Sequence, residues 1–180
     1  VPVGVDEYGV AGALMGQPLE LVKCKSCDLE VPAEAEIVLE GYVSATERQM
    51  EAPFGEFTTM YGGPHMYHVV TVTAITMRKK PIYLDCFSGH LDHQLLGGTG
   101  RLSTIYKTVR MACPTVKDVF MPPSGCCRLS CYVSIHKRHE GEAKNAVGAV
   151  LASDPFIKYV VVVDDDVNIY SDSAVLQAIA

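Results

Sequence analysis

Two glutamates, Glu51 and Glu56, flank a Pro-Phe-Gly turn in the stretch MEAPFGEFTTMYGG, residues 50–63. Proline fixes the backbone angle φ and glycine permits turns closed to other residues, so this loop can hold acidic side chains in set positions. Two carboxylates that converge on one pocket repel each other, and desolvation raises the pKa of one, which can then donate a proton. The pair therefore permits acid and base chemistry near neutral pH, although two glutamates at this spacing in a loop are most often solvated surface groups.

The segments before this loop predict a helix followed by strands. Residues 6–16 have small and apolar side chains at helical spacing, acidic residues in the first turn and a glycine at the end. Strands are predicted for residues 19–24 and, from the alternation of apolar residues, for 37–43. In the second strand Glu40 is expected on the polar face, opposite the apolar side chains.

The segments after the loop extend this pattern. Two β-branched and aromatic runs within residues 66–89 are separated by RKKP, which predicts a hairpin with Pro81 at a strand edge. The hydrophobic period then changes and predicts a helix over 100–113. Further strands are expected at 116–122, 127–137 and 157–163, and further helices at 140–153 and 171–180. The fold class is therefore α/β, with a mixed sheet or open barrel flanked by helices.

Composition restricts the function classes. The chain has 180 residues, a hydrophobic fraction of 48% and a formal net charge of -6, which are ordinary values for a folded domain. Scattered basic residues argue against nucleic-acid binding, and no apolar run approaches the ~20 residues of a membrane span. The N-terminus lacks the pattern of a signal peptide, so we expect a cytoplasmic protein. The missing initiator methionine and the helical pattern running to the last residue lead us to expect a fragment.

The seven cysteines leave two interpretations open. Cys24 and Cys27 have the C-x-x-C spacing of half a zinc site or of a redox motif, and the other half would come from Cys126, Cys127 and Cys131. A second C-x-x-C is absent from the sequence, and cysteine is commonly a small buried apolar residue. Reduced thiols are the simpler interpretation.

Two polar clusters could also bind ligands. His90, Asp92 and His93 could act as metal ligands or as an acid and base pair, or they could belong to a solvated loop. Residues 164–166 are three consecutive aspartates after an apolar strand, where α/β sheets place ligands. Capping and ion pairing at a sheet edge is the interpretation that we favour for these aspartates.

The sequence resembles the UbiD family of decarboxylases. EAPFGEFT, residues 51–58, is similar to the family segment E-G-P-F/Y-G-E/D-x-T/H, and the match continues through residues 6–42, 121–129 and 160–170 in the family's order. The resemblance implies an enzyme that uses prenylated FMN to decarboxylate aromatic or α,β-unsaturated acids, in some members reversibly. It also implies a split β-barrel of the flavin-binding type, with a core over about 19–140 and strand-helix elements over 141–180 that lead into a further C-terminal domain.

The resemblance also implies roles for individual residues. Glu51 and Glu56 match the acidic positions of a Glu-Arg-Glu network, in which Glu56 would protonate the substrate carbon and Glu51 would pair with the arginine. Glu7 matches a ligand of the divalent metal, Mn²⁺ or Mg²⁺, that bridges to the cofactor phosphate, and K⁺ is a further implied ion. Lys23 would lie near the cofactor. Phe57 and residues 90–93, with His90, Asp92 and His93, would contact the substrate.

The chain departs from the family pattern at several points. Ala52 replaces the usual glycine, and Thr59-Met60 replaces a common Gly-Tyr. The family arginine, and the Asn and His that share the metal, would lie before the matched segment, so this chain alone is expected to be catalytically incomplete. A flavin prenyltransferase would supply the cofactor, and the full-length protein would be a homo-oligomer. The alternatives are a non-catalytic flavin-site domain or accessory subunit, and a cysteine-based zinc or redox module.

Overall fold

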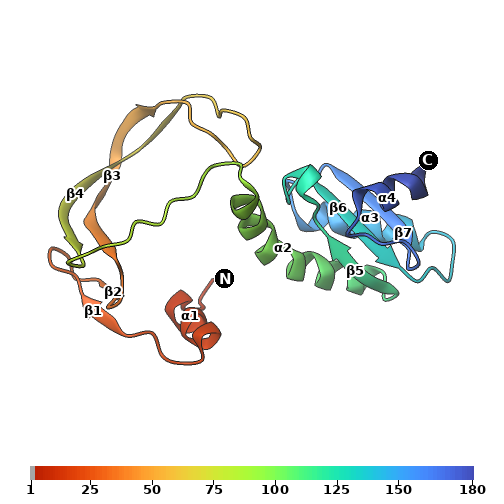
Figure 1. The fold of residues 1–180 in the computed structure, drawn as a ribbon, viewed down its shortest axis with the longest axis horizontal. Coiled ribbons are helices and arrows are strands. Elements are labelled where there is room, and N and C mark those ends of the chain that lie inside the picture. The colour runs from red at the N-terminus through yellow and green to blue at the C-terminus, as the bar shows by residue number, and fades with distance from the viewer. Residues whose placement is uncertain (1–2) are drawn as a thin grey trace. The chain divides into compact units, whose positions relative to one another are not determined.

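The computed structural model describes residues 3–180, which form two compact units (Figure 1). Unit 1 runs to Ala52 and resumes over Gly63–Asp85, whereas unit 2 comprises Pro53–Gly62 and Cys86–Ala180. The chain therefore leaves unit 1 for one loop, returns, and leaves it again. Glu51 belongs to unit 1, and Glu56 belongs to unit 2.

Unit 1 contains one helix and two antiparallel strand pairs. Its elements are α1 (Glu7–Met15), β1 (Leu21–Lys23), β2 (Glu30–Pro32), β3 (Ile37–Glu51) and β4 (His65–Met77). Strand β1 pairs with β2, and β3 pairs with β4 in a register that runs from Ile37 opposite Met77 to Glu51 opposite His65. Helix α1 was predicted, and it begins because the Asp6 carboxylate accepts hydrogen bonds from backbone N–H groups of the first turn.

The polar and apolar faces of β3 are the reverse of those expected. Leu39 and Val43 are 64% and 63% exposed, whereas Glu40 is only 4% exposed. The alternation correctly predicted a strand, but placing Glu40 on a solvated face was wrong. The reason is that the turn after β1 covers the Glu40 carboxylate and donates hydrogen bonds to it.

The predicted hairpin around Pro81 is also wrong. Strand β4 ends at Met77, and residues 81–87 have no regular secondary structure. The partner of β4 is β3, which precedes it in the chain. After Pro81, which has no N–H to donate to a ladder, the Ile82 N–H donates to the Glu36 side chain at 3.1 Å.

Unit 2 is a mixed sheet with helices, as the sequence predicted. The elements are α2 (Leu91–Ala112), β5 (Val116–Phe120), a 3₁₀ turn η1 (Pro123–Gly125), β6 (Ser130–Ile135), α3 (Glu142–Ser153), β7 (Tyr159–Asp164) and α4 (Asp172–Ile179). The strand order is β5-β6-β7, with β5 antiparallel and β7 parallel to β6. Helix α2 begins at Leu91, well before the expected start at residue 100.

The core of unit 2 lies between this sheet and helices α2 and α3. Ile105 and Val109 of α2 pack with Val133 of β6 and Val150 of α3, and each of these side chains is at most 1% exposed. A second cluster includes Val175, where α4 joins the sheet. Burial of such side chains stabilises a fold by roughly 1.5–3 kcal/mol each. Unit 2 therefore offers a rigid scaffold for the loops attached to it.

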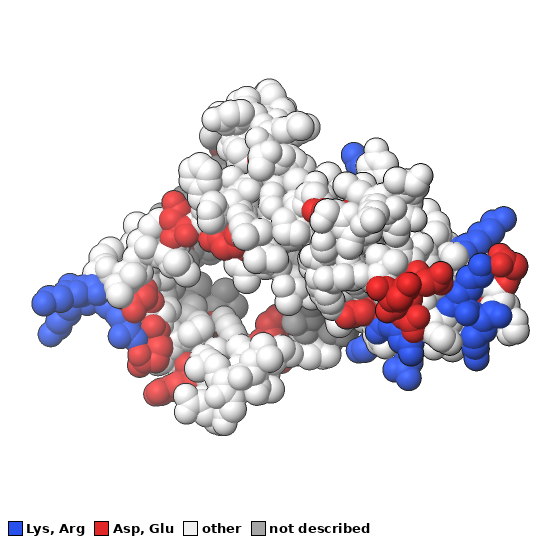
Figure 2. Space-filling view, turned by 45° about the vertical axis from the view of Figure 1, so that its right-hand side comes forward, with Lys and Arg blue, Asp and Glu red and all other residues white. Residues whose placement is uncertain are grey.

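The described residues contain three separate sheets and no closed barrel, so the split-barrel detail and its extent over about 19–140 stay predictions. On the face shown in Figure 2, Lys and Arg side chains lie among Asp and Glu side chains. Among the described residues, none of the helices combines the length and the apolar character that crossing a membrane requires.

Candidate functional site

The loop over 53–62 folds on itself within unit 2. The Glu56 N–H donates to the Met60 carbonyl at 2.9 Å, and the Gly62 N–H donates to the Phe54 carbonyl at 3.0 Å. These two bonds fix the backbone on both sides of the tip. The Glu56 side chain is half-buried and lies against Gly62, where an added Cβ would be 3.2 Å from its Oε1.

Phe57 anchors this loop to the rest of unit 2. Its ring lies under the Arg128 guanidinium, 4.3 Å from the guanidinium carbon, and makes an edge contact with Phe156 at 6.1 Å between centroids. The Gln94 side chain, which is 7% exposed, donates from Nε2 to the Phe57 carbonyl at 3.2 Å. Phe57 is thus held by α2, by the segment between η1 and β6, and by the segment between α3 and β7. Its expected contact with substrate stays a prediction.

A salt bridge lies next to the Phe156 ring. Arg101 of α2 pairs with Asp154, which is 6% exposed and follows α3. The same guanidinium lies over the Phe156 ring, 4.8 Å from its centroid. The Asp154 carboxylate also accepts from the Phe156 N–H at 2.9 Å. The ring and the backbone of Phe156 are therefore both held in place, and Phe57 of the loop over 53–62 packs against this ring.

Glu56 lines a cavity of about 480 Å³ on unit 2. This volume lies within the ~300–1,000 Å³ typical of sites for small molecules. The lining residues are Gly55, Glu56, Thr59, Met60, Tyr61, Phe87, Ser88, Gly89 and His90. The structure therefore brings together Glu56 and His90, two of the residues singled out from the sequence, at one cavity that also carries aromatic side chains.

Asp92 orients His90. Its Oδ1 lies 2.8 Å from His90 Nδ1 and accepts the His93 N–H at the same distance. The hydrogen bond from His90, then that from the His93 backbone, lowers the pKa of the Asp92 carboxyl below its ordinary value. The His93 ring instead accepts the Gly89 N–H at 3.2 Å. His90 and Asp92 thus form a hydrogen-bonded pair, and His93 contacts the backbone just before α2. Among the described residues, no cluster of three metal ligands occurs here.

The site candidates in unit 1 lie on three different elements. Glu51 is the last residue of β3 and is exposed, and Glu7 is exposed in the first turn of α1. Lys23 pairs with the exposed Asp28 at 2.7 Å. Because Glu51 and Glu56 lie in different units, their convergence on one reacting carbon stays a prediction.

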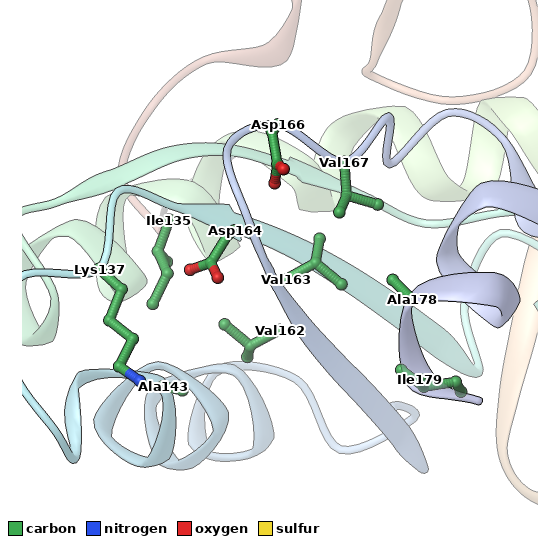
Figure 3. A pocket seen from close by; sticks show the side chains of 10 residues that line it. All are labelled: Ile135, Lys137, Ala143, Val162, Val163, Asp164, Asp166, Val167, Ala178 and Ile179. Atoms are coloured by element: carbon green, nitrogen blue, oxygen red, sulfur yellow. The ribbon is translucent and has the colours of Figure 1, made fainter.

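The three consecutive aspartates begin with Asp164, the last residue of β7, and Asp164 and Asp166 line the same cavity. His136 Nδ1 lies 3.0 Å from Asp165 Oδ2. Asp164 lines a cavity of about 320 Å³ together with Lys137, and Figure 3 shows these two side chains on one side of it. The Lys137 pKa is raised, first by its bond to Glu140 and then by nearby charges that include Asp164. Charge pairing at the sheet edge is the interpretation that these contacts favour.

Sequence reasoning missed several residues that hold the site. Arg101, Arg128 and Phe156 contact Phe57 or one another only after folding, and no local pattern marks such contacts. Gln94 had a weak signal, since it is a polar residue on the side of α2 that is buried.

The two halves of the chain match two domains of one family. Residues 1–91 match the 3-octaprenyl-4-hydroxybenzoate carboxy-lyase Rift-related domain, and residues 94–180 match the carboxy-lyase C-terminal domain. The chain is also 37% identical to the anhydromevalonate phosphate decarboxylase of Methanothermobacter thermautotrophicus, over 100% of this chain and 42% of that protein.

Solved structures give the same relationship. The chain is similar to an evolved dimeric form of the UbiD-class enzyme HmfF from Pelotomaculum thermopropionicum, solved in complex with prFMN. The TM-score is 0.95 and the sequence identity is 46%, over 99% of this chain and 42% of that chain. Apo 3,4-dihydroxybenzoic acid decarboxylase (AroY) from Klebsiella pneumoniae is similar with a TM-score of 0.89 and 31% identity, over 100% of this chain and 39% of that chain. The chain therefore spans well under half the length of these relatives.

Proposed function

The chain belongs to the UbiD family of carboxy-lyases, and we propose that it is part of a decarboxylase that acts with prenylated FMN on aromatic or α,β-unsaturated carboxylic acids. The observation that carries this proposal is the cavity on unit 2 that Glu56 and His90 line together. A relative with 46% identity was solved in complex with prFMN, which supports the choice of cofactor. Reversal to carboxylation would depend on CO₂ supply.

Glu7 is the residue of this chain that we propose as a ligand of the metal that would accompany the cofactor. Glu7 offers an exposed carboxylate that has no ion-pair partner among the described residues, and hard cations such as Mg²⁺ and Mn²⁺ prefer oxygen ligands. Phosphate, water and residues beyond this chain would complete the metal shell, with K⁺ as a further ion. Lys23 would lie nearby as a positive charge. When bound, prenylated FMN supplies the electron sink that makes loss of CO₂ feasible.

Glu56 would supply the proton. When CO₂ leaves, the electron pair of the broken carbon–carbon bond stays on the substrate carbon, and a proton must replace the carboxylate there. A half-buried carboxyl group with its backbone fixed at two points can hold that proton at a constant position. Glu51 would act as a positioning residue through the family arginine, which this chain does not contain.

His90 would bind the polar end of the substrate. Asp92 holds one ring nitrogen of His90 at 2.8 Å, which leaves the other ring nitrogen for a substrate oxygen. Phe57 and His93 would act by shaping the loop and the start of α2 around the same cavity. We also propose a homo-oligomer for the full-length protein, and a flavin prenyltransferase as the source of the cofactor.

The test is Glu56→Gln in the complete protein, coexpressed with a flavin prenyltransferase and assayed for CO₂ release. Removing the proton donor should lower kcat by about 10²-fold or more. Absorption spectra should show the same cofactor content as in wild type. Glu20→Gln, at an exposed glutamate between α1 and β1, is the matched control and should retain full activity. Wild-type rates in Glu56→Gln at equal cofactor content would rule out the proton-donor role.

A further inference from the structure

The turn between β1 and β2 places two thiols beside a buried carboxylate within unit 1. The Sγ atoms of Cys24 and Cys27 and a carboxylate oxygen of Glu40 all lie within 4.8 Å of one another. Among the described residues, no other group of three or more histidine, cysteine or acidic side chains is so close. The turn itself is well defined, because the Cys24 N–H donates to the Leu29 carbonyl at 2.9 Å.

Glu40 shapes this turn and still has room for a ligand. Its Oε1 accepts the Lys25 N–H at 2.8 Å, and its Oε2 accepts the N–H and hydroxyl of Ser26 at 2.5 and 2.8 Å. A carboxylate offers about four lone-pair sites, so one remains, on Oε1. The Lys25 and Ser26 N–H groups lower the pKa of Glu40, which therefore stays ionised at neutral pH.

The three ligand types suit a borderline-soft divalent ion. Zn²⁺ binds thiolate sulfur at about 2.3 Å and carboxylate oxygen at about 2.0–2.2 Å, usually in a tetrahedron. Two sulfurs bound in this way lie about 3.8 Å apart, so the side chains of the turn need only a small contraction. A cation at this position would bind both sulfurs as thiolates and release their protons.

We propose that Cys24, Cys27 and Glu40 form a Zn²⁺ site with two thiolates, one carboxylate oxygen and a fourth position open to water. The ion would join the β1–β2 turn to β3, and so connect the two strand pairs of unit 1. This site is independent of the proposed decarboxylation, since it uses none of the residues assigned to that reaction. The sequence supplied its two cysteines, and the fold supplies the third ligand.

The test uses the complete protein, reduced and treated with a chelator, and Co²⁺ as a spectroscopic probe. Co²⁺ should give the near-ultraviolet absorption of thiolate-to-metal charge transfer, and Zn²⁺ should remove it at about one ion per chain. Cys24→Ser and Cys27→Ser should each abolish the band. Glu40→Gln should keep a weaker band, with affinity reduced by about tenfold or more. Cys126→Ser is the matched control, because this cysteine lies in unit 2, and it should leave the titration unchanged.

A second measurement guards against variants that fold poorly. Zn²⁺ should raise the melting temperature of wild type and of Cys126→Ser, and should not raise that of Cys24→Ser. Absence of the Co²⁺ band in folded wild-type protein would overturn the proposal. The same conclusion would follow if the band survived in both Cys24→Ser and Cys27→Ser, or if the two thiols formed a disulfide in air and the re-reduced protein bound no metal.

Discussion

The Arg128 guanidinium carbon lies over the Phe57 ring, 4.3 Å from the ring centroid. Phe57 directly follows Glu56, so this contact sets the distance between the proposed proton donor and the scaffold of unit 2. Space for the guanidinium comes from Gly97 of α2, where an added Cβ would lie 2.1 Å from an Arg128 nitrogen. A helix, a loop and the segment after η1 thus meet at one cation–π contact.

Arg128→Lys should loosen the Glu56 loop. Lysine keeps the charge but loses the planar group that stacks on an aromatic ring. We expect stability to fall by about 1 kcal/mol and kcat to fall more than KM rises, because the acid is displaced while the cavity remains. Thermal unfolding and steady-state kinetics of the complete enzyme check this. Arg110→Lys, at an exposed position near the end of α2, should change neither, and equal effects of the two substitutions would contradict the anchoring role.

Asp154→Ala should destabilise unit 2 strongly. The substitution leaves Arg101, whose side chain is 29% exposed, without its carboxylate partner and removes the acceptor of the Phe156 N–H. Breaking a largely buried pair from one side costs on the order of 2–4 kcal/mol. Asp28→Ala breaks the exposed pair with Lys23 and should cost less than about 0.5 kcal/mol. Denaturant unfolding of both variants gives the comparison, and similar losses in the two would refute the argument.

Cys131 should resist alkylation in the native protein. Its side chain is fully buried, and burial, with a smaller effect from Asp154, raises the pKa of the thiol to about 12. Since only the thiolate reacts, native protein at pH 8 should be labelled at the exposed Cys86 long before Cys131. Timed alkylation followed by peptide mass spectrometry measures both rates. Prompt labelling of Cys131 without unfolding would show that β6 opens readily.

The turn after β1 should loosen in acid. The folded-state pKa of Glu40 is lowered by the Lys25 and Ser26 N–H groups, so its stabilising effect is present above the ordinary glutamate pKa. That effect is lost as the pH falls below about 4 and passes the folded-state pKa. Amide exchange at Lys25 and Ser26, corrected for intrinsic rates, should therefore accelerate in this range. In Glu40→Gln the corrected exchange should be fast at every pH, and a retained acid transition in that variant would assign it to another group.

The sequence predicted those elements whose signals are local. The last helix was predicted from residue 171, and in the structure the Ser171 hydroxyl accepts the Ala174 N–H at 3.3 Å and caps it. The strand around Glu40 was also predicted, because alternation of apolar side chains needs only the strand period. Its burial was mispredicted, since the turn that covers Glu40 comes from a different part of the chain.

Long-range partners explain the remaining differences. The run after Pro81 has strand-forming residues, but β3 already pairs with β4 along its length. Helix α2 starts at Leu91 because Gln94 is held by the carbonyls of Gly89 and Phe57, a constraint outside any helical pattern. The same limit applies to the candidate site. Glu56 and His90 could be singled out by residue type, whereas Arg128 and Gln94, which hold the Glu56 loop, could not.

The two family matches meet between residues 91 and 94, whereas unit 2 includes Pro53–Gly62. Recombination at the family boundary would therefore separate Glu56 from its support. A chimera that takes residues 1–91 from one family member and 94–180 from another would take Glu56, the proposed proton donor, from the first parent and the residues that contact Phe57 from the second. We therefore expect such a chimera to be active only where the residues that contact Phe57 have the same shape in both parents.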